Sequence, residues 1–117
     1  MDSKIVNELR EIQELCLKHG DHSAGATVGQ LLREYEEDQQ RFWDSLTSDA
    51  VWGGAGSIAD QCLSSSKTFA DQELQQDRRL VWRALAEVAR EMKAAGRMNE
   101  RTESWASAFR SWLRQGI

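Results

Sequence analysis

The sequence predicts an all-α protein, a compact bundle of five to six helices in a single domain that covers residues 1–117. Apolar residues recur at spacings of three and four along most of the chain, which places them on one face of a helix. None of the 117 residues is proline, so few helix breaks are imposed. Alternation of apolar and polar residues never persists, and Val and Ile are sparse, so no strand is expected.

Two amphipathic helices are expected in the first third of the chain. The first covers about residues 3–19 and ends at Gly20, which can adopt the left-handed conformation of a helix stop. The second covers about residues 23–37. Gly25 and Gly29 lie near its start, where each costs about 1 kcal/mol relative to alanine. Alternatively, these glycines permit the close approach of a neighbouring helix.

A third, shorter helix is expected to follow Asp38, whose side chain can cap it. Its apolar residues are Phe42, Trp43 and Leu46. The second and third segments could equally form one long bent helix, and the sequence leaves both alternatives open.

The strongest local signal for a turn is a glycine-rich run within residues 50–60. A phosphate-binding loop is not supported, because the run lacks the lysine of a P-loop and no strand precedes it. The glycines instead permit a turn that lets Trp52 pack against a helix before a short helix begins and extends to about Leu63. The predicted structural motif consists of Gly53, Gly54, Gly56, Ser57 and Asp60.

Two longer helices are expected in the C-terminal half, after an exposed connection at residues 64–67. One starts at a capping pattern near Thr68 and ends at Gly96, and the other starts near Asn99 and ends at Gly116. In the last helix Trp105, Phe109 and Trp112 share one face. This stripe is interpreted as core, with an exposed partner-binding stripe as the alternative.

The net charge of −4 conceals an uneven distribution. Residues 1–77 hold six basic and fifteen acidic side chains, a charge of −9. Residues 78–117 hold nine basic and four acidic side chains, a charge of +5. Because glutamates alternate with these cations and the pI is about 5.2, nucleic acid is not expected as a partner.

The acidic segment at residues 34–44 is the candidate binding surface. It mixes carboxylates with Tyr, Phe and Trp, a combination that can steer and anchor a basic protein surface. A solvated helix face over a buried aromatic stripe is the alternative interpretation. The residues expected to bind a partner are Glu34, Glu37, Asp38, Arg41, Trp43 and Asp44, with Trp52 in support.

No catalytic residue, metal site or cofactor is expected. Cys16, His19 and His22 are close in sequence, but Gly20 interrupts the helix and a closed zinc site needs a fourth ligand. Nothing places an imidazole beside Cys62 to form a nucleophilic pair. Two cysteines without a secretory signal favour reduced thiols in the cytoplasm, and no apolar run is long enough to span a membrane.

The run from Val51 to Asp60 resembles an aromatic-Gly-Gly-x-Gly-Ser-hydrophobic-x-Asp motif of small bacterial helical proteins. In those proteins, as here, the motif follows one or two amphipathic helices. Some of them are similar to immunity proteins that accompany toxins of interbacterial competition. The resemblance covers about residues 5–63 and implies no catalytic residue.

The resemblance implies a cytoplasmic, non-enzymatic protein that binds and neutralises a cognate toxin. An acidic surface suits a toxin whose active-site surface is basic because its substrate is a nucleic acid or a nucleotide. The alternative function is a helical interaction or homodimerisation module that uses the Trp105, Phe109 and Trp112 stripe.

Overall fold

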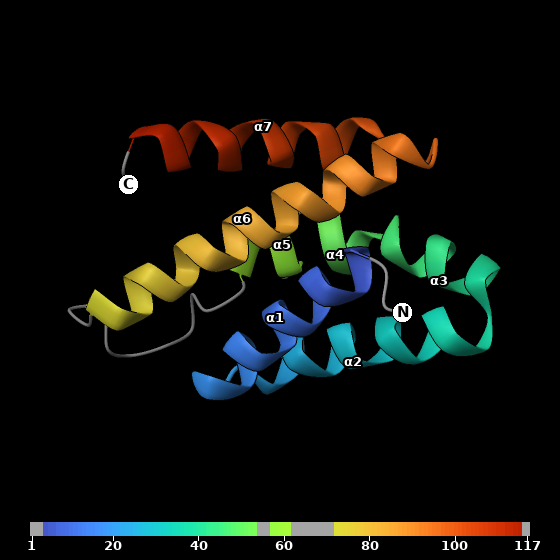
Figure 1. The fold of residues 1–117 in the computed structure, drawn as a ribbon, viewed down its shortest axis with the longest axis horizontal. Coiled ribbons are helices and arrows are strands. Elements are labelled where there is room, and N and C mark those ends of the chain that lie inside the picture. Colours follow the sequence, from blue (N-terminus) through green and yellow to red (C-terminus); the bar gives the residue numbers. More distant parts are fainter. Residues whose placement is uncertain (1–3, 54–56, 62–71, 116–117) are drawn as a thin grey trace.

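The computed structural model describes residues 4–53, 57–61 and 72–115, which form helices and no strand (Figure 1). The all-α prediction is confirmed. Within these residues there are five helices of eight residues or more and two single turns. The long helices are α1 (Lys4–Lys18), α2 (His22–Glu37), α3 (Gln39–Leu46), α6 (Gln72–Ala94) and α7 (Glu100–Gln115). The single turns are α4 (Asp49–Trp52) and α5 (Ile58–Gln61).

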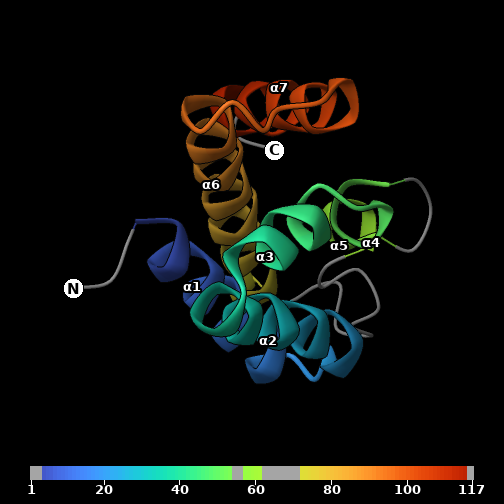
Figure 2. The ribbon, with the colours of Figure 1, turned by 90° about the vertical axis from the view of Figure 1, so that its right-hand side faces the viewer.

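Helix α6 is the central element of the bundle. It packs against α1 on one side and against α7 on the other, while α2 pairs with α1 at the far end (Figures 1 and 2). Helices α3, α4 and α5 flank this stack. The radius of gyration is 13.4 Å, close to the roughly 13 Å of a compact chain of this length. None of the described helices has both the length and the apolar composition needed to cross a bilayer.

A tight connection joins α1 to α2. Gly20 adopts a φ of +73°, the left-handed conformation predicted for a helix stop. Asp21 then caps α2, since its carboxylate accepts a hydrogen bond from the Ala24 backbone N–H at 3.3 Å. Gly96 ends α6 in the same way, with a φ of +71°. Both glycine stops are confirmed.

The glycines of α2 lie against α1. A Cβ atom at Gly29 would lie 2.9 Å from Nε2 of Gln13, and one at Gly25 would lie 3.3 Å from Cδ2 of Leu17. Both glycines are buried. They therefore let the two helices pack closely, which favours the second of the two interpretations of these residues.

The helical conformation is interrupted between α2 and α3 at Asp38. This residue has an extended conformation with φ −158° and ψ 96°, so the two segments are separate helices. Its N–H donates to the carbonyl of Glu34, and its carboxylate accepts from the N–H of Arg41. The same residue ends one helix and starts the next, as predicted for the cap.

One element differs from the sequence expectation. Residues 49–52 form the helical turn α4, which was not predicted. Helix α5 is described over Ile58–Gln61, and its predicted extension to Leu63 lies outside the described residues. The helical pattern of α4 is too short to show a periodic face, so its helicity depends on tertiary packing. The predicted connection at 64–67 and the cap at Thr68 lie outside the described residues.

The core joins all of the longer helices. Phe42, Trp52 and Phe109 are its largest fully buried side chains. Trp52 is the one tryptophan in the buried core, while Trp43, Trp82, Trp105 and Trp112 are half-buried and pack at its edge. The tryptophans thus contribute less to the centre of the core than the sequence suggested, because an indole is too large to be enclosed easily in a small bundle.

An aromatic cluster of Trp82, Trp105, Phe109 and Trp112 holds α7 on α6. Phe109 is fully buried, and its ring centroid lies 5.6 Å from that of Trp105 and 5.7 Å from that of Trp112. Trp82 from α6 lies 6.4 Å from Phe109 and nearly parallel to it. The core interpretation of the α7 stripe is therefore confirmed for Phe109, and the two tryptophans form its half-exposed margins.

Candidate functional site

The predicted acidic segment folds into an exposed corner where α2 meets α3. We call Glu36, Glu37, Asp38 and Asp44 the α2–α3 acidic surface, because all four side chains are exposed. The side chains of Glu36 and Glu37 make no hydrogen bond or ion pair with any described residue. Asp44 accepts a hydrogen bond from Nε2 of Gln40 at 3.2 Å. Glu36 was absent from the predicted site, although it belongs to the same run of carboxylates.

Glu34 does not belong to this surface. It is only 5% exposed, and the Ser45 hydroxyl donates to its two carboxylate oxygens at 2.7 and 3.1 Å. Nε of Arg41 lies 3.8 Å from the same carboxylate, although the Arg41 side chain is largely exposed. Glu34 and Ser45 therefore tie α2 to α3, and Glu34 is a structural residue of the corner.

Asp38 has a structural role as well, because it is the N-cap of α3. Its Oδ1 accepts from the N–H of Arg41 at 3.2 Å. We expect Asp38→Ala to lower the free energy of unfolding by about 1 kcal/mol, the usual cost of a lost cap. Asp38→Asn, which retains the capping oxygen, is the control. Chemical denaturation of both variants measures the difference, and equal losses would contradict the capping role.

Trp43 lies beside the acidic surface and under an arginine. The ring is half-buried and meets Phe42 edge-on, with 5.1 Å between ring centroids. The guanidinium of Arg97 lies over the Trp43 ring, 5.8 Å from its centroid. This cation–π contact connects α3 with the segment that joins α6 to α7. Trp43 can therefore take part in binding only at its exposed margin.

Trp52 is placed at the wall of a groove rather than on the acidic surface. The side chain is 1% exposed, and its indole nitrogen is enclosed with no hydrogen-bond acceptor among the described residues. A hollow of about 440 Å³ adjoins it. The residues that line this hollow are Trp52, Gly53, Glu100, Arg101, Ser104 and Trp105.

A second hollow of about 420 Å³ continues the first. It shares Trp52, Glu100 and Arg101 with the first hollow and adds Thr47, Ser48 and Asn99. We call the combined depression the α4–α7 groove. Sequence reasoning missed it because the two walls are separated by about fifty residues, and no local pattern pairs α4 with the start of α7.

The glycine motif borders this groove. Gly53 and Ser57 are buried, and the Ser57 hydroxyl donates to the carbonyl of Gly53 at 2.8 Å. Ser57 directly precedes α5, the position predicted for a cap. Gly54, Gly56 and the side chain of Asp60 lie outside the described residues. The predicted packing of Trp52 against neighbouring helices is confirmed by its burial.

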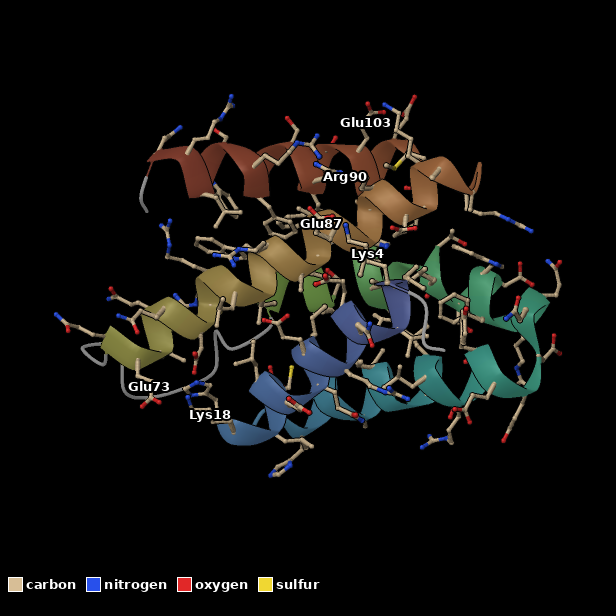
Figure 3. The ribbon with its side chains drawn as sticks, in the orientation of Figure 1. Lys4, Lys18, Glu73, Glu87, Arg90 and Glu103 are labelled. Atoms are coloured by element: carbon tan, nitrogen blue, oxygen red, sulfur yellow. The ribbon has the colours of Figure 1, made fainter. Side chains whose placement is uncertain are left out.

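A buried carboxylate fastens the end of α1 to the start of α6. Asp77 accepts from Nε2 of His19 at 2.7 Å, and Nζ of Lys18 lies 2.8 Å from the same oxygen. Glu73 also contacts Lys18, at 2.6 Å (Figure 3). Burial acts to raise the pKa of Asp77, but the hydrogen bonds from Lys18 and His19 outweigh it and leave the pKa below its usual value.

A second ion pair joins the start of α1 to the later part of α6. Nζ of Lys4 lies 2.9 Å from Oε2 of Glu87, and Arg90 lies 3.8 Å from the other carboxylate oxygen (Figure 3). The hydrogen bond from Lys4 lowers the pKa of Glu87 despite partial burial. Glu8 behaves oppositely, since burial and the carboxylates of Glu11 and Glu87 raise its pKa.

These pairs predict an acid-sensitive fold. Because the pKa of Asp77 in the folded state lies below the usual value of 3.8 for an aspartate, its ionised form contributes stability above about pH 4. That stability is lost as the pH falls through the lowered pKa. We expect Asp77→Asn to be less stable than the wild type at pH 7, with a difference in unfolding free energy that narrows as the pH falls below about 4. Urea denaturation of both proteins at a series of pH values from 7 downward measures this difference. A difference that does not change with pH would contradict the ion pair of Asp77 with Lys18 and His19.

Cys16, His19 and His22, which the sequence places close together, have separate roles in the described structure. Cys16 is buried and forms no disulfide, His19 contacts the carboxylate of Asp77, and His22 is exposed at the start of α2. Among the residues that the structure describes, no three His, Cys, Asp or Glu side chains are placed to hold a metal ion.

Comparison with protein-family models, with curated proteins and with solved structures finds no match to the chain. A functional proposal for this all-α helical bundle therefore depends on its own surface chemistry and on the resemblance of the glycine motif.

Proposed function

We propose that the chain is an immunity protein that binds and neutralises a cognate bacterial toxin through the α2–α3 acidic surface. The observation that carries the proposal is the number of exposed carboxylates on one short stretch of chain: Glu36, Glu37, Asp38 and Asp44. Within the fold, by contrast, Ser45 holds the carboxylate of Glu34. Lys18 pairs with that of Asp77, and Lys4 pairs with that of Glu87. Carboxylates held at an exposed corner are suited to a basic partner.

The proposed mechanism is steric and electrostatic rather than enzymatic. A toxin that acts on a nucleic acid or a nucleotide has a basic active-site surface, which the acidic corner would cover. Opposite charges would accelerate the encounter, and the exposed margin of Trp43 would add apolar contact. The resemblance of residues 51–60 to the motif of immunity-like proteins supports the same function.

The proposed compartment is the bacterial cytoplasm. Cys16 is buried and forms no disulfide, as is usual for a cysteine in a reducing compartment. An inhibitor of this kind meets its toxin where the toxin acts. The proposed partner is a protein, and we do not propose that the chain binds nucleic acid or a membrane.

Coexpression tests the proposal directly. The chain would be coexpressed with the tagged product of each neighbouring gene, and growth and copurification would be recorded. A neighbouring product that arrests growth alone, is tolerated with this chain and copurifies with it in a defined ratio is the expected result. If no neighbouring product is toxic, or if a toxic one remains toxic without forming a complex, the proposal is wrong.

Self-association is the second candidate function, and the exposed margins of Trp105 and Trp112 are the observation in its favour. Sizing of the purified chain in solution separates the two candidates. A monomer of 13.3 kDa is expected from the immunity proposal, because the buried Phe109 leaves only the flanks of this stripe free.

A further inference from the structure

The α4–α7 groove begins where the α2–α3 acidic surface ends. Asp44 is exposed on the last turns of α3, and Thr47, three residues later, already lines the groove. The Nδ2 atom of Asn99 lies 3.5 Å from the carbonyl of Thr47 and connects the opposite wall. A partner that contacts Asp44 and extends along the end of α3 would therefore reach the groove at Thr47.

The chemistry of the groove differs from that of its acidic neighbour. Its lining includes the half-buried indole of Trp105 from α7 and small hydroxyl side chains such as Ser104, while Trp52 from α4 borders it with only 1% of its surface exposed. Glu100 and Arg101 bring one negative and one positive charge to the described lining, so the lining has no net charge. An uncharged, largely apolar side chain suits such a surface better than a lysine or an arginine does.

The size and openness of the groove favour a side chain on a protein loop. Each hollow has a volume of about 420 to 440 Å³ and lies open at the surface. Open depressions with aromatic walls are typical places for the anchoring residues of a protein interface. The indole nitrogen of Trp52 is enclosed and has no acceptor among the described residues, so it reports on changes at the edge of the groove.

We propose that the α4–α7 groove receives an uncharged aromatic or long aliphatic side chain from a basic loop of the toxin. The cationic side chains of that loop contact Glu36, Glu37 and Asp44 at the adjoining acidic surface. The inference rests on the proposed immunity function and deepens it. Charge complementarity selects the loop, since residues 33–60 hold seven acidic and two basic side chains.

Two matched tryptophan substitutions on α7 test the groove. Ser104 and Ser107 are both exposed serines of this helix, but of the two only Ser104 lines the described groove. Ser104→Trp fills the groove, whereas Ser107→Trp places the same side chain outside it. With the copurified toxin as the probe, we expect Ser104→Trp to raise Kd at least about tenfold and Ser107→Trp to change it less than about threefold. Circular dichroism checks that both variants remain folded.

A spectroscopic measurement keeps the test decisive if Ser104→Trp fails to fold. The indole N–H signal of Trp52 would be assigned in the wild type by its disappearance in Trp52→Phe. Addition of toxin is expected to shift this signal. An unshifted Trp52 signal overturns the groove inference.

The outcomes also separate the two proposals. If Ser104→Trp folds and binds as tightly as the wild type, the groove inference is overturned while the immunity function stands. If the wild-type chain forms no complex with any toxic neighbouring product, both are overturned.

Discussion

Phe109→Ala is expected to lower the free energy of unfolding by about 3–5 kcal/mol, the usual cost of truncating a fully buried phenylalanine. The side chain is completely enclosed between α6 and α7 and touches the rings of Trp82, Trp105 and Trp112. Its loss opens a cavity at the only extensive contact of α7 within the described residues, which is the contact with α6. Urea denaturation followed by tryptophan fluorescence measures the change.

Arg110→Ala is the matched control for Phe109→Ala. Arg110 is the next residue of α7 and is exposed, so its truncation should change stability by less than about 0.5 kcal/mol. If Phe109→Ala were no more destabilising than this control, α7 would not be packed on α6 as described.

Reversal of two charges, Glu36→Lys with Glu37→Lys, is expected to weaken toxin binding at least tenfold, a change of about 1.4 kcal/mol or more. Both side chains are exposed and bonded to no described residue, so the fold should tolerate the change. These positions are preferred to Glu34 and Asp38, because the structure uses Glu34 to hold Ser45 and Asp38 to cap α3.

Glu11→Lys with Glu14→Lys provides a control with the same change in net charge. Both glutamates are exposed and belong to α1, so neither is part of the α2–α3 acidic surface. Calorimetry with the purified toxin compares the two double variants and the wild type. Equal losses from both double variants would mean that net charge governs binding and that the acidic corner is not the interface.

Much of the fold could be predicted from the spacing of apolar residues and from the glycines that end helices. The apolar residues of α1 recur with helical spacing, so this helix could be predicted from the sequence. Gly20 and Gly96 have positive φ angles, and glycine at such positions is a local signal for the end of a helix. Turn α4 could not be predicted, since four residues show no period and gain their helical form from packing.

The candidate site was less predictable than the fold. The run of carboxylates identified the corner, but it did not show that the chain turns at Asp38 and encloses Glu34 behind Ser45. Trp52 was expected to support the acidic surface, whereas it lies in the core beside the α4–α7 groove. Those differences depend on contacts between elements, which no single segment of sequence encodes.

The central claim is that an exposed acidic corner guides this chain onto a basic toxin. The most direct test is the association rate constant with the toxin, measured by stopped flow as the salt concentration rises from about 0.1 M to about 1 M. Over this range the Debye length falls from about 10 Å to about 3 Å, so a steered association should slow at least about tenfold. An association rate that does not change with salt would contradict the account.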